Sequence, residues 1–408
     1  MDPKRIAIIG GGPAGAFAAA ELARAGQEVL LFDEKLAWEK PCGGGLTDKA
    51  LARWPFLRDS QVERNWISDC ELIAPSGRRV AFRLDRPIAI FSRLALNGLL
   101  LDRARQAGAR VLRERITRIE GNASDWNLRS SSGDYRADFV VMAAGARNPF
   151  RGQFSQALGP ENFMVAVGFY IPGTREVAQI KFLKGLRGYL WIFPRSDHFS
   201  AGICGRMKGK STAELRRRLE DSLPEFGLGL EDARFYAHIL PSYTVKTLQN
   251  AAFSGDGWAM AGDAAGFVDA ITGEGLYYAL RSAELLAQAL LANAPESYPV
   301  LVKQDFLPEL ERAARIADRF YSGDWLGGSV LERMVQLTGR SARFRDLMRD
   351  LFAGTQEYFD LRRRVRQSLP KIVTETLVST VWRPRAAAGL VPSSPDTHKE
   401  KFRLRARV

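Results

Sequence analysis

Cys42 is considered first because its thiol is reactive and because it stands before three consecutive glycines in KPCGGGLT, residues 40–47. Each glycine loses more backbone freedom on folding than any other residue, so an ordered run of three is costly. Such a run predicts that a ligand approaches the backbone here. The other cysteines, Cys70 and Cys204, lack this context and are expected in the core. Three scattered cysteines indicate a reducing, cytoplasmic setting rather than a disulfide framework.

A second group of residues predicts a binding site for a dinucleotide. An apolar segment at 5–9 is followed by G-x-G-x-x-G, an Ala-rich helical segment at 14–25, a second apolar segment at 29–32 and two acids. In this order the glycines let a pyrophosphate approach the backbone, and its charge lies at the helix N-terminus. An acid after the second strand binds the ribose hydroxyls. The residues expected to contact the dinucleotide are Gly10, Gly12, Pro13, Ala14, Gly15 and Asp33, with Glu34 as the second choice for the ribose.

A distant stretch bears on which dinucleotide is bound. Residues 262–280, GDAAGFVDAITGEGLYYAL, follow a short apolar strand and lead into an apolar helix predicted over 276–291. The arrangement resembles the second FAD motif of the flavoprotein superfamily that includes aromatic hydroxylases. The resemblance implies that Asp263 binds the ribityl chain and that the next turn directs a helix N-terminus towards the flavin, where it favours negative charge. The resemblance also implies cofactor contacts from Gly262, Gly273, Gly275, Leu276 and, at the phosphates, Arg93.

The electron donor has no comparable motif. The sequence contains a single G-x-G-x-x-G, so it predicts no separate domain for a pyridine nucleotide. We expect an external reductant to dock transiently, either NAD(P)H or a small electron-transfer protein.

The strand and turn at 137–146 carry Ala144 where aromatic hydroxylases usually have an aspartate, and this departure disfavours a hydroxylase.

Residues 151–250 predict the substrate pocket. Short runs of alternating apolar residues, broken by Gly or Pro, are typical of an antiparallel meander. Such a sheet can cover a flavin and form one wall of a pocket. The run GYLWIFP at 188–194 places Tyr189, Trp191 and Phe193 on one face. An aromatic lining suits a long hydrocarbon or an aromatic ring, while ordinary sheet core is the alternative.

KPCGGGLT, GYLWIFP and the 262–280 stretch together resemble the geranylgeranyl reductase family of flavoproteins, which reduces isolated double bonds of isoprenoid chains. The family's substrate-side signature is P-x-x-Y-x-W-x-F-P. This chain matches it at Tyr189, Trp191, Phe193 and Pro194. Leu186 replaces the first proline of this signature. Ala270 stands where the family often has a proline in the second FAD motif. The resemblance covers about residues 5–290 and leaves open the chain length and headgroup of the substrate.

This resemblance implies a mechanism. An unactivated alkene is a poor hydride acceptor, so hydride transfer from reduced FAD to one carbon must be coupled to protonation of the other. The protein must align the chain on the flavin, exclude water and supply a proton. Cys42, with Gly43 and Gly44 beside the flavin, is implied to deliver or orient this proton, the alternative being a structural thiol. The ring faces of Tyr189 and Trp191 would stabilise positive charge that develops on the substrate.

Two other functions are compatible with the same motifs. An FAD-dependent monooxygenase or halogenase would act on an aromatic or hydrophobic substrate. Residues 189–194 partly match the halogenase signature W-x-W-x-I-P, but no catalytic lysine is identified. A non-enzymatic FAD-binding lipid carrier or scaffold is the third possibility. No spacing typical of metal ligands occurs.

The sequence as a whole predicts an α/β fold, α+β overall, with a Rossmann-type FAD-binding domain, an antiparallel-sheet substrate domain and a helical C-terminal region. The expected FAD-binding segments are 1–150 and 251–300, with the substrate domain between them at 151–250. Helix-period apolar positions predict the helical region at 301–385. Residues 386–408, rich in proline, serine and charge, are expected to form a flexible basic tail.

The 408-residue chain carries a net charge of +13. This excess suits an anionic substrate or peripheral association with an anionic membrane surface. The basic run at 362–366 either meets such a headgroup or forms a solvated helix face. No apolar run is long enough to span a bilayer, and no nucleic-acid-binding module is found. We therefore expect a cytoplasmic protein, peripheral to the membrane if the basic run binds lipid.

Overall fold

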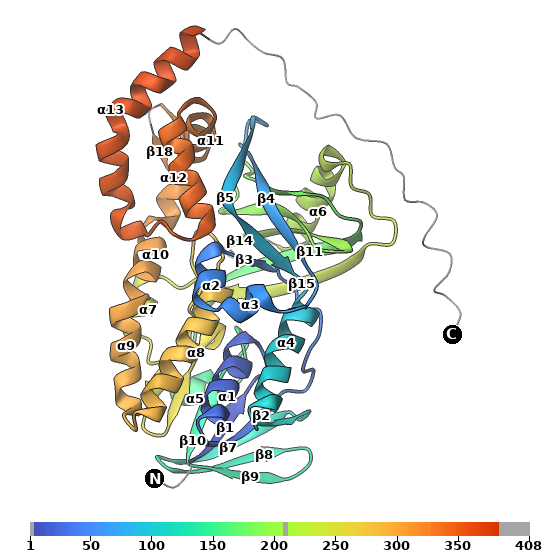
Figure 1. Ribbon diagram of the computed structural model, residues 1–408, viewed down its shortest axis with the longest axis vertical. Helices are drawn as coiled ribbons and strands as arrows, with labels where there is room; N and C mark the ends of the chain where they lie inside the picture. Colours follow the sequence, from blue (N-terminus) through green and yellow to red (C-terminus); the bar gives the residue numbers. More distant parts are fainter. Residues whose placement is uncertain (1–3, 207–210, 326, 383–408) are drawn as a thin grey trace.

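Two large sheets and a group of C-terminal helices make up the computed structural model, which describes residues 4–206, 211–325 and 327–382 (Figure 1). One sheet has the mostly parallel order of a Rossmann-type domain, and the other is mostly antiparallel. The predicted fold class, including the helical C-terminal region, is confirmed. The predicted tail at 386–408 lies outside the described residues.

The six-stranded sheet carries the dinucleotide motif. Its order is β16-β17-β10-β1-β2-β6, and neighbours from β17 to β6 are parallel. The strands are β1 (Arg5–Ile9), β2 (Glu28–Phe32), β6 (Arg110–Leu112), β10 (Phe139–Met142), β16 (Ser254–Gly255) and β17 (Trp258–Met260). Helix α1 (Pro13–Arg24) packs against α4 (Arg93–Gln106) and α8 (Leu276–Leu291). A three-stranded sheet of β7 (Ile116–Asn122), β8 (Asp125–Ser130) and β9 (Asp134–Ala137) joins the same core.

The eight-stranded sheet has the order β15-β11-β14-β13-β12-β4-β5-β3. Its strands are β3 (Gly45–Leu46), β4 (Arg64–Ile73), β5 (Arg79–Phe91), β11 (Phe163–Pro172), β12 (Val177–Lys181), β13 (Gly188–Pro194), β14 (His198–Arg206) and β15 (Arg234–Pro241). Strands β3, β4 and β5 come from the segment 1–150, which the sequence analysis assigns to FAD binding. They belong to this sheet because β4 pairs in parallel with β12, about a hundred residues away. Local patterns do not reveal a pairing of this range.

Alternation along β13 separates the two faces of this sheet. Leu190 and Ile192 pack on one face with residues of α6 (Thr212–Ser222). Tyr189, Trp191 and Phe193 lie on the opposite face, as a strand's period of two requires. The Trp191 ring lies over Gly202 of β14, its register partner, where a Cβ would stand 2.3 Å from the ring.

The C-terminal helices are α9 (Tyr298–Asp305), α10 (Leu307–Ser322), α11 (Val330–Arg340), α12 (Ala342–Ala353) and α13 (Tyr358–Trp382). Helices α11 and α12 cover the aromatic face of this sheet, whereas α9 packs against α8 of the Rossmann-type domain. Apolar side chains of α11 and α12, such as Met334 and Met348, share a buried cluster with Leu72 of β4 and Ile88 of β5. Within the residues that the structure describes, no helix is both long and apolar enough to cross a membrane.

Candidate active site

A cavity of about 600 Å³ is lined by residues from both sheets and from the C-terminal helices. At one end the lining comes from the carboxyl ends of β1, β2, β10 and β17, where open parallel sheets bind their ligands. The lining then includes the Cys42 loop, the aromatic face of β13, and apolar residues of α11 and α12. The dinucleotide motif and the aromatic run, far apart in sequence, therefore open into one space.

Most residues predicted to bind the cofactor line this cavity: Gly10, Gly12, Pro13, Ala14, Asp33, Glu34, Cys42, Gly43, Gly44, Arg93, Asp263, Gly273, Gly275 and Leu276. Two predicted glycines lie behind the lining. A Cβ on Gly15 would stand 1.9 Å from the carbonyl oxygen of Gly10, so Gly15 allows α1 to pack on the preceding turn. Gly262 has a φ of 61°, and its N–H donates to Ser282 Oγ at 3.0 Å. Both glycines shape the turns rather than line the space.

The two candidate ribose ligands are held differently. Asp33 Oδ2 accepts the N–H of Gly11 at 2.7 Å, and Asp33 Oδ1 accepts the N–H groups of Lys35 and Leu36 at 2.8 and 2.7 Å. These bonds fix the Asp33 carboxylate at the end of β2. The side chain of Glu34 is 50% exposed and pairs with Arg115 at 3.6 Å. The geometry thus supports Asp33 as the first choice for the ribose.

Hydrogen-bonding groups without protein partners gather at the dinucleotide end. Helix α1 begins after Gly12, and no side chain caps it, so its N-terminus suits a phosphate. Among the described residues, buried Arg93 Nε has no hydrogen-bond partner, and neither has His238 Nε2. Burial, with a smaller effect of Lys40, lowers the pKa of His238 to about 3, so the imidazole is neutral. Such donors and acceptors around a long cavity fit FAD, whose phosphates and flavin ring need both.

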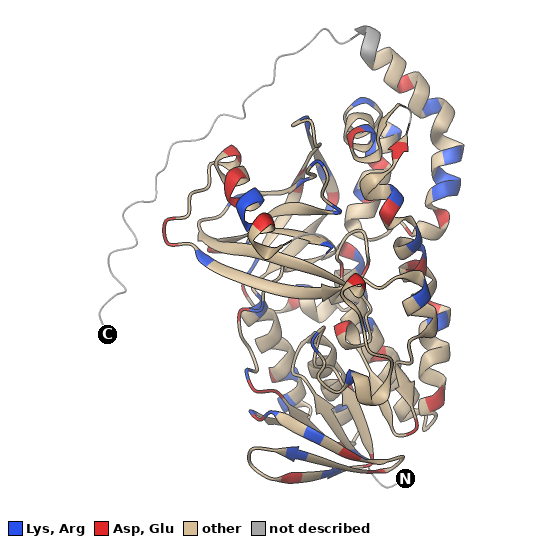
Figure 2. Ribbon diagram, turned by 180° about the vertical axis from the view of Figure 1, so that it is seen from behind, with Lys and Arg blue, Asp and Glu red and all other residues tan. Residues whose placement is uncertain are grey.

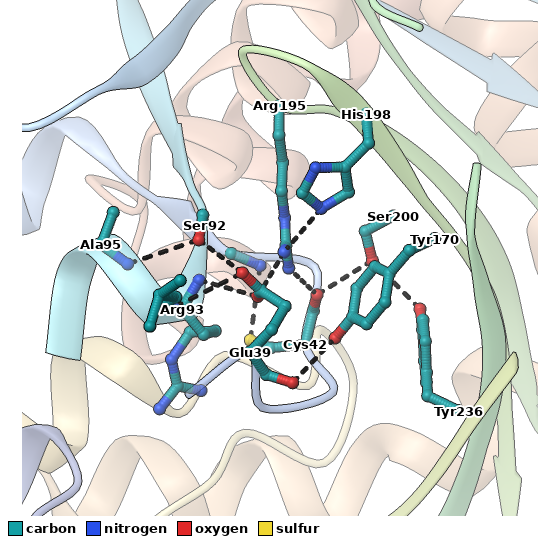
Figure 3. Close-up of polar contacts among 12 residues, drawn as sticks. Glu39, Cys42, Ser92, Arg93, Ala95, Tyr170, Arg195, His198, Ser200 and Tyr236 are labelled. Atoms are coloured by element: carbon teal, nitrogen blue, oxygen red, sulfur yellow. Dashed lines mark hydrogen bonds and ion pairs between the residues drawn. The ribbon is translucent and has the colours of Figure 1, made fainter. Parts of the chain in front are cut away.

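Figure 3 shows how the Cys42 loop is held against the sheet. Arg195, fully buried at the end of β13, donates from Nη2 to the carbonyl oxygen of Cys42 at 2.7 Å. Ser200 Oγ donates to the same oxygen at 2.9 Å. The indole N–H of Trp191 donates to Ser200 Oγ at 3.2 Å, and Tyr236 Oη lies 3.0 Å from it. A hydroxyl has one proton, so Ser200 accepts from both rings while it donates to Cys42.

Glu39 connects this loop to Arg93, the predicted phosphate ligand. Its carboxylate pairs with Arg195 Nη1, accepts the Ser92 hydroxyl, and accepts the N–H of Arg93 at 2.9 Å. Ser92 also caps α4 by accepting the N–H of Ala95 at 3.3 Å. Burial alone would raise the pKa of Glu39, but the charge of Arg195 and these hydrogen bonds outweigh it and leave the pKa below its ordinary value. Glu39 is therefore an anion that fixes Arg93 relative to Cys42.

Comparisons with known proteins agree with this site. Residues 4–155 match the family model described as pyridine nucleotide-disulphide oxidoreductase. The geranylgeranyl diphosphate reductase of Synechocystis sp. is 26% identical over 371 residues, which cover 82% of this chain and 86% of that protein. The chain is an FAD-dependent oxidoreductase and a homologue of the geranylgeranyl reductases.

Solved structures place this oxidoreductase in the same architecture. A geranylgeranyl bacteriochlorophyll reductase-like protein from Thermoplasma acidophilum superposes with a TM-score of 0.75 at 20% identity, covering 92% of this chain and 98% of that one. A variant of the halogenase PltM in complex with FAD gives 0.62 at 17% identity, covering 94% and 93%. At these identities the two structures support the fold alone.

The far end of the oxidoreductase's cavity is apolar. Its lining there comes from both the sheet and the helices: Leu72, Ile88, Ile180, Phe182, Phe320, Met334, Met348, Leu351 and Phe352. Cys204, expected in the core, is 2% exposed and also lines the cavity, because it pairs in register with Tyr189. Burial raises the pKa of the Cys204 thiol to about 12. Cys70 is fully buried and lies outside the lining.

Several site residues of the oxidoreductase escaped the sequence analysis. Glu39, Arg195 and Ser200 lie near the predicted motifs, but a single charged or hydroxyl residue beside a motif has many uses, so the sequence predicts no role for them. His198, which lies in no motif of the sequence, accepts from Arg195 Nη1 at 3.1 Å through Nε2, since arginine only donates. The one available signal was the position of Arg195 directly after the Tyr-x-Trp-x-Phe-Pro run.

Proposed function

We propose that this protein reduces C=C bonds of an isoprenoid chain bound in the apolar part of the cavity. The observation that carries the proposal is the continuity of one space from the dinucleotide motif, past Cys42, to an apolar slot between the eight-stranded sheet and α11 and α12. A flexible hydrocarbon fits such a slot, because burial of each CH₂ contributes about 0.8 kcal/mol. The named activities of the homologous reductases support the same substrate class.

Different residues of the cavity have different roles in the proposed reaction. FAD, when bound and reduced, supplies a hydride. The side chains of α11 and α12 bind the hydrocarbon and exclude water from the reacting carbons. The ring faces of Tyr189 and Trp191 stabilise positive charge at the more substituted carbon, and Phe193 completes the substrate wall beside Gly43. The Cys42 thiol, which accepts the N–H of Gly44 at 3.3 Å, delivers or orients the proton.

An anaerobic single turnover tests this function. The protein is loaded with FAD, reduced with dithionite and mixed with geranylgeranyl diphosphate, and the flavin spectrum and the product mass are recorded. We expect flavin reoxidation together with a mass gain of two hydrogens per bond reduced. A C4a-hydroperoxide that forms promptly with oxygen, without anaerobic alkene reduction, would instead identify a monooxygenase or halogenase. Persistent failure of the bound flavin to turn over with any reductant would support a carrier or scaffold.

We propose an external reductant for the flavin, either NAD(P)H or a small electron-transfer protein. The one G-x-G-x-x-G of the chain lies at the dinucleotide end of the cavity, in the position expected for FAD, so the reductant has to dock elsewhere. Stopped-flow bleaching of bound FAD by NADPH and by NADH distinguishes these donors. Bleaching by neither nucleotide, with fast bleaching by a reduced ferredoxin or flavodoxin, would identify a protein donor.

We also propose that α13 docks on an anionic membrane surface and so brings the cavity to its lipid substrate. Phe359, Leu369, Val373, Leu377 and Val378 are exposed on this helix, between 41% and 62%. Figure 2 shows basic residues along this helix. Arg362, Arg363 and Arg366 are exposed on it. Leu361 of the same helix lines the cavity. An apolar and basic exposed face is typical of interfacial helices.

Vesicle sedimentation tests this docking. We expect binding to phosphatidylglycerol vesicles, weaker binding in high salt, and weak binding to phosphatidylcholine. Replacing Arg362, Arg363 and Arg366 by Glu should abolish it. The matched control replaces three exposed arginines elsewhere, Arg83, Arg118 and Arg136, by Glu, which makes the same change in net charge. Equal loss in both triple variants would show that overall charge, rather than α13, drives the association.

A further inference from the structure

A turn between the FAD motif and the substrate strand β13 carries a carboxyl group that has no role in the mechanism proposed so far. Glu274 stands between Gly273 and Gly275 and lines the cavity. On one side, Tyr189 Oη donates to the carbonyl of Thr272, and a Cβ on Gly273 would stand 3.0 Å from that hydroxyl. On the other side, a Cβ on Gly275 would stand 3.3 Å from Asp263 Oδ1. Glu274 therefore lies where the substrate wall and the FAD motif meet.

The turn that carries Glu274 is rigid. Asp269 Oδ1 accepts the N–H groups of Ile271 and Thr272 at 2.7 and 2.9 Å, and the Asp269 N–H donates to the carbonyl of Glu274 at 3.0 Å. Tyr321 of α10 donates to the carbonyl of Ile271. These bonds hold the backbone of Glu274 at the cavity wall. Its carboxyl accepts the N–H of Tyr277 through Oε1 at 2.9 Å, which fixes the side chain as well.

We propose that Glu274 is the acid that supplies the proton for alkene reduction; the inference rests on the proposed function. One C=C bond takes up a hydride at one carbon and a proton at the other. The O–H bond of Glu274 breaks as the new C–H bond forms, and the two-electron oxidation of the reduced cofactor accompanies it. The resulting carboxylate regains its proton from solvent. Cys42 then orients the reacting carbon or relays the proton, and the thiol is not the ultimate source.

The surroundings keep this carboxyl protonated near neutral pH. Burial, and then the neighbouring Asp269, raise the pKa of Glu274 to about 7, although the N–H of Tyr277 and the charge of Lys49 on α2 (Asp48–Arg53) oppose the rise. The other titratable groups near it are Tyr278 on α8, Glu309 on α10 and Tyr358 on α13. An acid with a pKa near the working pH is the most effective proton donor.

The pH dependence of the single turnover in Glu274→Gln tests the proposal. In the wild type the rate should fall as pH rises through about 7, because Glu274 loses its proton. Glu274→Gln should bind and reduce FAD normally but reduce the alkene about 10² to 10⁴ times more slowly, without this pH break. Cys42→Ala should keep the break. Glu284→Gln, a control on α8, the helix that follows Glu274, lies outside the cavity and should match the wild type in rate and pH profile.

An infrared measurement tests the acid independently of turnover. A protonated carboxyl has a C=O stretching band that a carboxylate lacks. The wild-type minus Glu274→Gln difference spectrum should show this band at pH 6 and lose it by pH 9. Absence of the band at pH 6, or an unchanged rate and pH break in Glu274→Gln, would overturn the proposal. A wild type that shows the band but reduces no alkene would refute the proposed function and with it the role of Glu274.

Discussion

Replacing Arg195 by Met removes the cation that holds the Cys42 loop. The guanidinium is fully buried and pairs with Glu39, whose side chain is 15% exposed. It also donates to the carbonyl of Cys42 and to His198. Loss of one partner from a buried ion pair costs about 3–5 kcal/mol, because the other charge stays buried and unpaired. Because Glu39 is partly exposed, we take the lower end of this range, a cost of about 3 kcal/mol. This cost corresponds to roughly a hundredfold increase in the equilibrium constant for opening of the loop.

Thiol labelling under native conditions measures this opening. Cys70 and Cys204 are buried, so a soluble thiol reagent reports on half-buried Cys42. We expect the Arg195→Met protein to be labelled up to about a hundred times faster than the wild type at pH 8. Arg187→Met, which removes a surface arginine paired with Asp318 at 3.2 Å, should leave the rate unchanged.

The pH dependence of labelling tests whether the unpaired charge of Glu39 causes the loop to open. Without Arg195, its charge and its hydrogen bond no longer lower the pKa of Glu39, so we expect this pKa to rise. Protonation on lowering the pH then removes the unpaired charge, so the difference between Arg195→Met and wild type, expressed as a free energy of opening, should shrink from pH 8 to pH 5.5. The double variant Arg195→Met/Glu39→Gln should be labelled more slowly than Arg195→Met at pH 8. A single variant labelled within threefold of wild type, or a difference independent of pH, would refute the argument.

Three further outcomes are expected. Cys42→Ala should slow anaerobic alkene reduction by about 10²-fold, whereas Cys70→Ala, outside the cavity, should change it little; equal small effects would remove Cys42 from the chemistry. Gly44→Ala should weaken FAD binding, measured by equilibrium dialysis, because its φ is 83° and a Cβ would stand 2.1 Å from the carbonyl oxygen of Phe91; unchanged affinity would contradict this. Glu274→Gln should gain stability relative to wild type as pH rises from 5 to 8, by at most about 3 kcal/mol in urea unfolding. The gain follows because the folded pKa of about 7 exceeds the ordinary 4.5, so the wild type loses stability over this range; a difference that does not change with pH would disprove the raised pKa.

Much of the cofactor end was predictable from sequence because its signals are local. A strand, a glycine turn and a helix follow one another within residues 5–24, so spacing alone places Gly10, Gly12 and Pro13 at one helix N-terminus. The predicted helix over 276–291 has the same bounds as α8 for the same reason. The aromatic face of β13 follows from a period of two, which is also a local property.

Long-range pairing and burial decided the rest. Residues 64–91 joined the substrate sheet through the parallel contact of β4 with β12, and no local pattern specifies the partner of a strand. Glu39, Arg195 and Ser200 gained their roles when two segments far apart in sequence, residues 39–42 and 195–200, met beside the carbonyl of Cys42. Glu274 can serve as an acid only because folding buries it beside Asp269, which shifts the balance between its charged and neutral forms. Sequence thus determined that the glycine turns can bind a dinucleotide. Tertiary structure determined which side chains of the site are charged.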